Sequence, residues 1–544
     1  MQPNTRLTHT ESAPPARPAR RNGLRAVLAR AVVPRNLYRW HRLIALFTLI
    51  PVSCWCISGL AHPFMAHWFK PAIAREFVRP TALDRAALAL PLPDVLRRNN
   101  VTMFRTFRVV SLAGQPYYQL KAIDHTFRYY DSRTGAELPD GDRRYAESLA
   151  RYFVDDTRSA VTLTRVEQFS DEYRYVNRLL PVWKVSFDRP DRMDVYVETE
   201  LGRLANYNER SRKAFLWLFN NFHNWDWLAA ISNHSLRIGV MLVCLALIIL
   251  STGSGLLLYG FLWKRTARTP VGRVGVLRQY HRQIGLAVSL VTLTFAGSGA
   301  YHATRKLTPD ERIRYLRQPV VRAGELRASF LALPLDWTNV TGLSLAVVGE
   351  KPYYQVTLKP APAGWSGRQV DRAETGKAGE TDRAEPNVLY YDAQTAALLP
   401  DGVMEHAKDL VRRFWLADAS GKGPGSCCEP LDADAETLPA LRQTDWLTRF
   451  DREYGFINKR LPVAKLALDT PDRLTYYVEP ATSRLAARIV DADRREGFSF
   501  AVFHKFFFMD WAGKTVRDVV MLLSALGVLV VSLFGVALFI RVRR

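Results

Sequence analysis

Four long apolar runs stand out from an otherwise polar chain and set its organisation. They cover residues 43–60, 238–263, 284–303 and 519–540. A single run of this kind could be a buried helix of a globular domain. Four runs, each with basic residues at one end, instead predict transmembrane helices, because about 20 apolar residues span a bilayer. With their flanks, the predicted spans are 37–63, 236–263, 281–303 and 516–540.

The basic residues of the short segments predict the direction of these spans. Nine arginines against one acid, Glu11, precede the first apolar run, the linker 264–280 is basic without an acid, and the tail 541–544 carries three arginines. Because short cytoplasmic segments are enriched in Lys and Arg, we expect segment 1–36, the linker and the tail to be cytoplasmic. Segments 64–235 and 304–515 are then two large periplasmic domains of a bacterial inner-membrane protein, with no cleavable signal peptide.

Composition adds little beyond this topology. The formal net charge is +23 over 544 residues, but the basic surplus of the short segments is explained by membrane orientation, so we expect a lipid bilayer and no nucleic acid as a partner. Of the five cysteines, Cys54, Cys56 and Cys244 lie in apolar runs and should pack as small hydrophobic residues. Adjacent Cys427 and Cys428 could form a strained disulfide or bind a soft metal.

The two halves of the chain repeat one another, which predicts an internal tandem duplication. The recurring motifs are Trp40-His41-Arg42 with Tyr280-His281-Arg282, Pro116-Tyr117-Tyr118-Gln119 with Pro352-Tyr353-Tyr354-Gln355, Glu172-Tyr173 with Glu453-Tyr454, and Asp226-Trp227 with Asp510-Trp511. The second half carries additional stretches near 361–385 and 418–440, which we interpret as surface insertions. Alternating residues at 183–187 and 194–198 predict antiparallel strands, and helical patterns near 142–153 and 403–415 complete an α+β external domain.

Histidines at the span ends are the sharpest chemical signal. His41 and His62 are 21 residues apart, as are His281 and His302. On a straight helix this spacing is about 31 Å, close to the thickness of a bilayer core. A lone histidine at a helix end is more often an interfacial polar residue. The repeated spacing of four favours a function, because ionisable groups at membrane depth are costly.

Facing imidazoles in a helical bundle suit the two axial positions of a haem iron. The expected pairs are His41 with His281 near the cytoplasm and His62 with His302 near the periplasm. His223 and His504, in aromatic stretches before the second and fourth spans, could replace a periplasmic ligand. Cations for the haem propionates are available at both faces, and they include Arg42 and Arg282 on one side and Arg237 and Arg517 on the other.

At these residues the chain resembles the PepSY-associated transmembrane family, which includes iron-regulated membrane proteins and inner-membrane ferric-siderophore reductases. The resemblance covers most of residues 36–544. Its motifs are the two span-opening His-Arg patterns, the small-residue pairs Ser58-Gly59, Thr252-Gly253 and Ser298-Gly299, and the external motifs Leu180-Pro181-Val182, Tyr196-Val197 and Leu201-Gly202-Arg203. It implies PepSY-like external domains and two b-type haems held by His41, His62, His281 and His302. The chain departs from the pattern at His504, three positions early relative to Asp510-Trp511, and at Ser483-Arg484, which lacks the glycine.

Three functions follow as alternatives. The first is a haem-dependent ferric (siderophore) reductase in iron uptake that moves electrons across the membrane to a ferric chelate. No dinucleotide fingerprint accompanies a strand-turn-helix context, so the expected electron donor is a quinol or another protein. The second is a non-catalytic PepSY-domain membrane sensor or peptidase modulator. The third is an accessory subunit of a metal uptake system.

Overall fold

The computed structural model describes residues 33–266, 272–307, 316, 318–359, 387–419 and 437–543. The chain divides into two compact units. A helical unit comprises Met1–Cys56, Val240–Ala300 and Ser524–Arg544, and a sheet unit comprises Ile57–Gly239 and Tyr301–Leu523. Cys427 and Cys428 and most of both predicted insertions lie outside the described residues.

Four long helices correspond to the four apolar runs. They are α2 (Val33–Pro63), α7 (His234–Thr266), α8 (Gly272–Thr304) and α12 (Lys514–Arg543). Each is long and apolar enough to cross a membrane, with a mean hydropathy of 1.5 to 2.7 over its most apolar window. A helix suits that environment because it satisfies its backbone hydrogen bonds internally. The expectation of a multi-pass membrane protein is supported to this extent.

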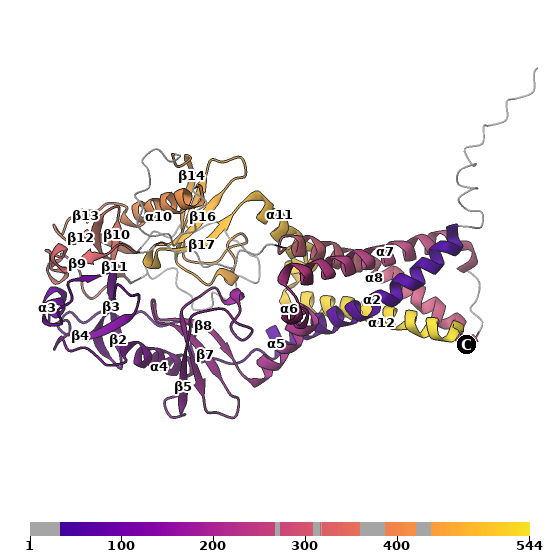
Figure 1. The fold of residues 1–544 in the computed structure, drawn as a ribbon, viewed down its shortest axis with the longest axis horizontal. Helices are drawn as coiled ribbons and strands as arrows, with labels where there is room; N and C mark the ends of the chain where they lie inside the picture. The colour runs from indigo at the N-terminus through magenta and orange to yellow at the C-terminus, as the bar shows by residue number, and fades with distance from the viewer. Residues whose placement is uncertain are drawn as a thin grey trace, which may run out of the picture. The chain divides into compact units, whose positions relative to one another are not determined.

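The helical unit has a core to which all four helices contribute. Val52 of α2, Leu245 and Ile248 of α7, Ala296 of α8 and Val528 of α12 form one buried cluster, and the helices run side by side in Figure 1. Cys56 is buried in the same cluster, as expected of a small hydrophobic residue. The expected bundle of four helices is present in the described part of the chain.

The helices extend beyond the predicted spans into the predicted linker. We expected residues 264–280 to form a cytoplasmic loop, but α7 continues to Thr266 and α8 begins at Gly272. The reason is that basic residues are good helix formers. The apolar run alone therefore underestimates the length of each helix, while its position is correct.

The sheet unit is built around one seven-stranded antiparallel sheet. Its strand order is β13-β12-β11-β10-β2-β3-β4, and the two halves of the sequence meet where β10 pairs with β2, at Ser344 and Arg108. The first half supplies β2 (Thr106–Leu112), β3 (Gln115–Lys121) and β4 (Phe127–Asp131), and the second supplies β10 (Val340–Val348), β11 (Lys351–Leu358), β12 (Val388–Asp392) and β13 (Leu398–Leu399). A short helix, α3 (Leu92–Arg98), and the strand pair β1 (Met103–Phe104) with β9 (Val321–Arg322) pack on one face of the sheet, where their buried side chains share a cluster with Phe107 of β2 and Tyr354 of β11.

Two four-stranded sheets of identical order complete the sheet unit. One is β5 (Val161–Val166), β6 (Val182–Phe187), β7 (Asp194–Glu198) and β8 (Arg203–Asn208), and the other is β14 (Leu441–Leu447), β15 (Val463–Leu468), β16 (Thr475–Glu479) and β17 (Arg484–Ile489). Both show a register shift at the matching step, between Tyr196 and Val197 and between Tyr477 and Val478. The predicted strands 183–187 and 194–198 are confirmed as β6 and β7.

A helix covers each of these sheets and closes a hydrophobic core. Helix α4 (Gly141–Val154) packs Leu149 and Phe153 against Val185 and Val195, and α10 (Gly402–Ala419) packs its apolar face in the same way on β15 and β16. The helical patterns predicted near 142–153 and 403–415 are therefore confirmed. The α+β character of the predicted external domains is present in the described residues (Figure 1).

A buried network of charges joins the two four-stranded sheets. Arg203 of β8 pairs with Glu198 at 2.7 Å and with Glu479 of β16 at 2.5 Å, and Arg460 pairs with Glu479 at 2.7 Å. The side chains of Glu198, Glu479 and Arg460 are no more than 2% exposed. Burial opposes ionisation, but Arg203 and Arg460 hold the pKa of Glu479 at about 2. The two sheets are thus held together by carboxylates that stay charged.

Short helical segments connect the sheets to the first turns of α7 and α12. In the first half these are α5 (Arg210–Phe222) and α6 (Asp226–Ile231). In the second they are α11 (Asp491–Ser499), the π-helix η7 (Phe500–His504) and the 3₁₀-helix η8 (Phe507–Ala512). A further π-helix, η1 (Phe64–Trp68), directly follows α2. These segments carry His223 and His504.

Candidate functional site: two histidine pairs

The helical unit brings His41 of α2 together with His281 of α8. Their ring centroids lie 6.5 Å apart, with 63° between the ring planes. We call these two residues the span pair. The sequence predicted this pairing, and the geometry agrees with it.

Main-chain oxygens orient both rings of the span pair. His41 Nδ1 lies 3.1 Å from the carbonyl oxygen of Ser251 and 3.1 Å from Ser254 Oγ, and His281 Nδ1 lies 3.0 Å from the carbonyl oxygen of Val531. A carbonyl oxygen only accepts a hydrogen bond, so Nδ1 carries the proton in each ring. Nε2 then keeps its lone pair, which is the state that a metal ligand requires.

Two glycines make room for these rings. A Cβ added at Gly255 of α7 would lie 3.2 Å from His41 Cε1, and one added at Gly535 of α12 would lie 3.4 Å from His281 Cε1. The carbonyl groups that accept from the two rings belong to Ser251 and Val531, four positions before Gly255 and Gly535. Residues four positions apart lie on the same side of a helix, so each carbonyl and its glycine face the same ring. A larger side chain at Gly255 would displace the imidazole of His41.

The sheet unit contains a second set of four histidines arranged around two phenylalanines. Phe219 lies between His62, at 5.6 Å, and His223, at 4.5 Å, and Phe500 lies between His302, at 4.6 Å, and His504, at 4.7 Å. All these distances join ring centroids. The inner members, His223 and His504, are 6.4 Å apart with 85° between their planes. We call His223 and His504 the segment pair.

His223 is held as a neutral imidazole. Its Nδ1 lies 3.1 Å from Ser58 Oγ. Burial, together with the neighbouring His504, His62 and His302, lowers the pKa of His223 to about 3. At neutral pH its ring therefore carries no proton on one nitrogen and can act as a ligand.

His302 has a carboxylate partner. Its Nδ1 lies 2.5 Å from Glu496 Oε1, and the adjacent Arg305 pairs with Asp493 at 2.8 Å. Residue 215 holds the position equivalent to Glu496 if the halves are aligned on His223 and His504, and it is a phenylalanine. The surroundings of His62 and His302 therefore differ although their spacing from His41 and His281 is the same.

The four arginines proposed as propionate partners fall into two classes. Arg237 pairs with Asp226 at 2.8 Å, and Arg517 pairs with Asp510, so both already neutralise a carboxylate. Arg42 lies over the aromatic rings of Tyr38 and Phe539, at 5.7 and 5.1 Å from their centroids, and both Arg42 and Arg282 are half-buried. Arg42 and Arg282 thus remain the better candidates for a propionate.

Both pairs pass a simple test of fit for haem iron. Two imidazoles on opposite sides of one metal, each at a metal–nitrogen distance of about 2 Å, place their ring centroids roughly 6.3 Å apart. The observed separations are 6.5 Å for the span pair and 6.4 Å for the segment pair. Within the described residues no group of three or more His, Cys, Asp or Glu side chains is arranged to hold a metal ion. Two imidazoles are the donor set that a porphyrin leaves for the protein to supply.

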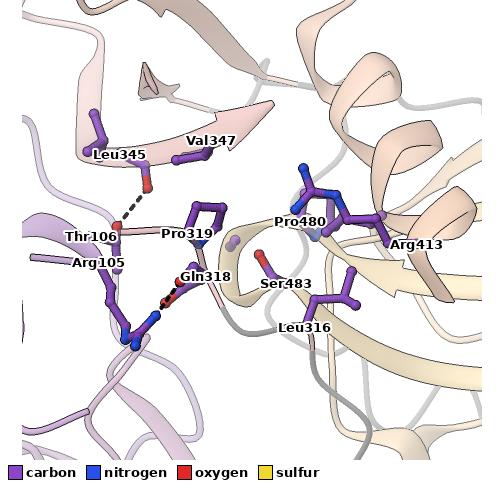
Figure 2. Close-up of a pocket in the computed structure, with 13 residues that line it drawn as sticks. Arg105, Thr106, Leu316, Gln318, Pro319, Leu345, Val347, Arg413, Pro480 and Ser483 are labelled. Carbon is purple, nitrogen blue, oxygen red and sulfur yellow. Dashed lines mark hydrogen bonds between the residues drawn. The ribbon is translucent and has the colours of Figure 1, made fainter. Parts of the chain in front are cut away.

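The sheet unit also contains a small polar pocket. Arg105, Gln318 and Arg413 line it together with residues of β10 and the turn at Pro480 (Figure 2). It leaves about 20 Å³ for the centres of water-sized molecules, which is room for one or two waters. Arg105 donates to the carbonyl oxygen of Gln318 at 2.5 Å, and Arg413 donates to that of Gly349 at 2.8 Å. This pocket is too small for a metal chelate.

Several residues of these clusters were not found from the sequence. They are Ser58, Phe219, Ser251, Gly255, Glu496, Phe500, Val531 and Gly535. One signal was available, because Phe and His recur four residues apart as Phe219 with His223 and as Phe500 with His504. The departure at His504 reflects the five residues between His504 and Asp510, against two between His223 and Asp226. The structure places these two histidines together despite that difference.

Comparison with known proteins gives no assignment. No protein-family model matches the chain, and a search of curated proteins finds no match.

Proposed function

We propose that this protein is a haem b protein of the bacterial inner membrane that passes electrons across the bilayer to a ferric chelate, such as a ferric siderophore. The proposal rests on two pairs of imidazoles. The ring centroids lie 6.5 Å apart in the span pair and 6.4 Å apart in the segment pair, and each pair belongs to a different unit of the chain. A haem supplies a one-electron carrier that shuttles between ferric and ferrous states. Reduction of the chelated ferric ion to ferrous weakens its binding to hard oxygen ligands.

The residues of the chain have defined roles in this proposal. His41 and His281 would be the axial ligands of one haem, and their bonds to the Ser251 and Val531 carbonyls fix the ring orientation and the tautomer. His223 and His504 would be the axial ligands of the second. Their centroid separation of 6.4 Å supports them, and the pairing of His62 with His302 that the span spacing predicts stays the alternative. His62 and His302 would then flank the second site across Phe219 and Phe500.

The membrane topology of the chain and the origin of its two halves are part of the same proposal. We infer both termini to be cytoplasmic and the sheet unit periplasmic, from the basic residues of the short segments. We infer a tandem duplication and PepSY-like domains, and the identical strand order and matching register shifts of the two four-stranded sheets support the duplication. A quinol or another protein would supply the electrons.

A reoxidation experiment tests the proposal. The purified full-length protein, reduced with dithionite in the absence of oxygen, should show b-type absorbance, and adding a ferric hydroxamate chelate should bleach it. The gallium chelate of the same ligand should leave the absorbance unchanged, because Ga³⁺ binds alike but accepts no electron. His125→Asn, which changes a histidine outside both pairs, should behave as the unaltered protein. A colourless, folded protein would leave the sensor, peptidase-modulator or uptake-subunit functions instead.

A further inference from the structure

The connecting segments of the sheet unit expose an unusual number of large apolar side chains. Their exposed fractions run from 40% to 85%, and the residues are Phe64, Trp68, Phe69, Trp217, Trp227, Ile231, Phe498, Phe503, Phe508 and Trp511. Trp511 is the most exposed, at 85%. Soluble proteins rarely leave apolar side chains in such numbers on neighbouring segments.

These side chains lie close along the chain to the first turns of two spanning helices. Helix α6 ends at Ile231, three residues before α7 begins at His234, and η8 ends at Ala512, two before α12 begins at Lys514. At no more than about 3.6 Å per residue, the ends lie within roughly 10 Å of each other. Exposed apolar residues continue onto the helices themselves, at Leu236 and Val516.

Ion pairs fix both segments to the helix that follows. Asp226, the first residue of α6, pairs with Arg237 in the first turn of α7 and also with Arg174 beside β5. Asp510 of η8 pairs with Arg517 in the first turn of α12. The side chains of Arg237 and Arg517 are 14% and 7% exposed. The backbone that carries the exposed Trp227 and Trp511 is therefore fixed to the helix that follows.

We propose that these segments lie in the headgroup region of the lipid bilayer. Trp217, Trp227 and Ile231 from the first half of the chain, and Phe508 and Trp511 from the second half, would be in contact with lipid. Tryptophan is well suited to this depth because its apolar ring enters the acyl boundary while its N–H reaches polar groups. Lipid is favoured over a second protein because the exposed apolar residues continue onto helices that are long and apolar enough to cross a membrane. These segments would then anchor the sheet unit to the membrane surface, whatever the role of the histidines.

Spin labelling tests this placement in the full-length protein. Cysteine introduced by Trp511→Cys or Ile231→Cys, in a chain with its five native cysteines replaced by serine or alanine, is labelled with a nitroxide and reconstituted into phosphatidylcholine–phosphatidylglycerol bilayers. Collisions with oxygen, which concentrates in lipid, should exceed collisions with a water-soluble nickel complex at both sites. Arg133→Cys, in an exposed turn after β4, is the matched control and should show the reverse. Nickel-dominated collisions at 511 and 231, or protection from both reagents as under a second protein, would overturn the proposal.

Fluorescence gives an independent measurement if the cysteine-free chain does not fold. Lipids brominated near the headgroup should quench part of the tryptophan emission of the otherwise native protein. Trp511→Phe and Trp227→Phe should each reduce the quenched fraction. Trp446→Phe, a change at a tryptophan that is 8% exposed within the core under α10, should leave the quenched intensity unchanged. Equal quenched intensity in all three variants would contradict the lipid contact.

Discussion

The two histidine pairs reach nearly the same separation by different means. In the span pair, both rings come from long helices, each is oriented by a main-chain carbonyl, and each faces a glycine on the opposing helix. In the segment pair, the rings come from the short segments α5–α6 and η7, each stacks on a phenylalanine, and the polar partner of His223 is the side chain of Ser58. Backbone carbonyls thus contact both rings of the span pair, with Ser254 Oγ as a second partner of His41, whereas the segment pair is positioned by side-chain packing within the sheet unit.

That difference predicts how each histidine pair responds to amino-acid substitution. A carbonyl oxygen cannot be removed by a substitution, whereas a hydroxyl or an aromatic ring can. Substitutions in the sheet unit should therefore alter the geometry of the segment pair and leave that of the span pair unchanged.

Removing a single imidazole should abolish one haem and spare the other. His41→Ala or His281→Ala leaves one axial position of the span pair without a donor, and His223→Ala or His504→Ala does the same to the segment pair. Each change should lower the haem content of the purified protein from two per chain to one, measured as the pyridine haemochrome per protein. Equal loss of both haems from every variant would show that the pairs do not act separately.

Breaking the buried charge network should destabilise the sheet unit. Glu479→Ala leaves two buried guanidinium groups, Arg203 and Arg460, with only Glu198 of this network, at 2.7 and 3.9 Å, and breaking a buried pair typically costs about 3–5 kcal/mol. In a urea titration, the absorbance of the segment-pair haem should disappear at lower denaturant than in the native protein, while that of the span pair should not move. Asp94→Ala, which removes an ion pair whose Arg97 side chain is 79% exposed, is the control and should cost at most about 1 kcal/mol.

Acid should weaken the sheet unit through a buried histidine outside both pairs. Burial lowers the pKa of His406 from 6.5 to about 3, with Arg413 adding to the effect. Between pH 6.5 and about 3, the unfolded chain therefore binds a proton at His406 that the folded chain does not bind. Stability is fully present above pH 6.5 and falls as the pH drops towards 3, by at most about 1.4 kcal/mol per pH unit for this group. His406→Gln should flatten the pH dependence of unfolding, and an unchanged slope would contradict the assignment.

Crowding the span pair should perturb one haem slightly. Gly255→Val places a side chain against the His41 ring, and overpacking of this kind typically costs about 1–3 kcal/mol. The reduction midpoint and the Soret position of the span-pair haem should shift, with those of the segment pair unchanged. Gly253→Val on the same helix is a close control, since a Cβ there meets nothing within 4 Å. Identical spectra for the two variants would remove Gly255 from the site.

The sequence was most informative where one physical requirement acts on many consecutive residues. Crossing a bilayer demands a long apolar run, so all four helices were found, although α8 begins at Gly272 rather than at 281, and alternation revealed β6 and β7. The span pair followed from the repeated His41 and His281 motifs. Its supporting carbonyls and glycines did not, because one glycine among several in an apolar helix carries no distinguishing signal.

The segment pair could not be predicted in the same way. Its rings meet only after α5 and η7 pack within the sheet unit, and the spacing to the Asp-Trp motif differs between the halves. Spacing on the spans pointed to His62 and His302, each of which the structure places beside a phenylalanine that also stacks on the inner pair. Tertiary packing, which the one-dimensional pattern does not contain, brings the rings of His223 and His504 to 6.4 Å from each other.

Electron paramagnetic resonance of the oxidised protein is the most direct measurement of the central claim, that each pair of imidazoles holds one haem iron. The spectrum should contain two low-spin ferric signals of the bis-imidazole type. His41→Ala and His281→Ala should remove the same signal, and His223→Ala and His504→Ala the other. A high-spin spectrum, or a second signal that persists in His223→Ala but disappears in His62→Ala and His302→Ala, would contradict the account.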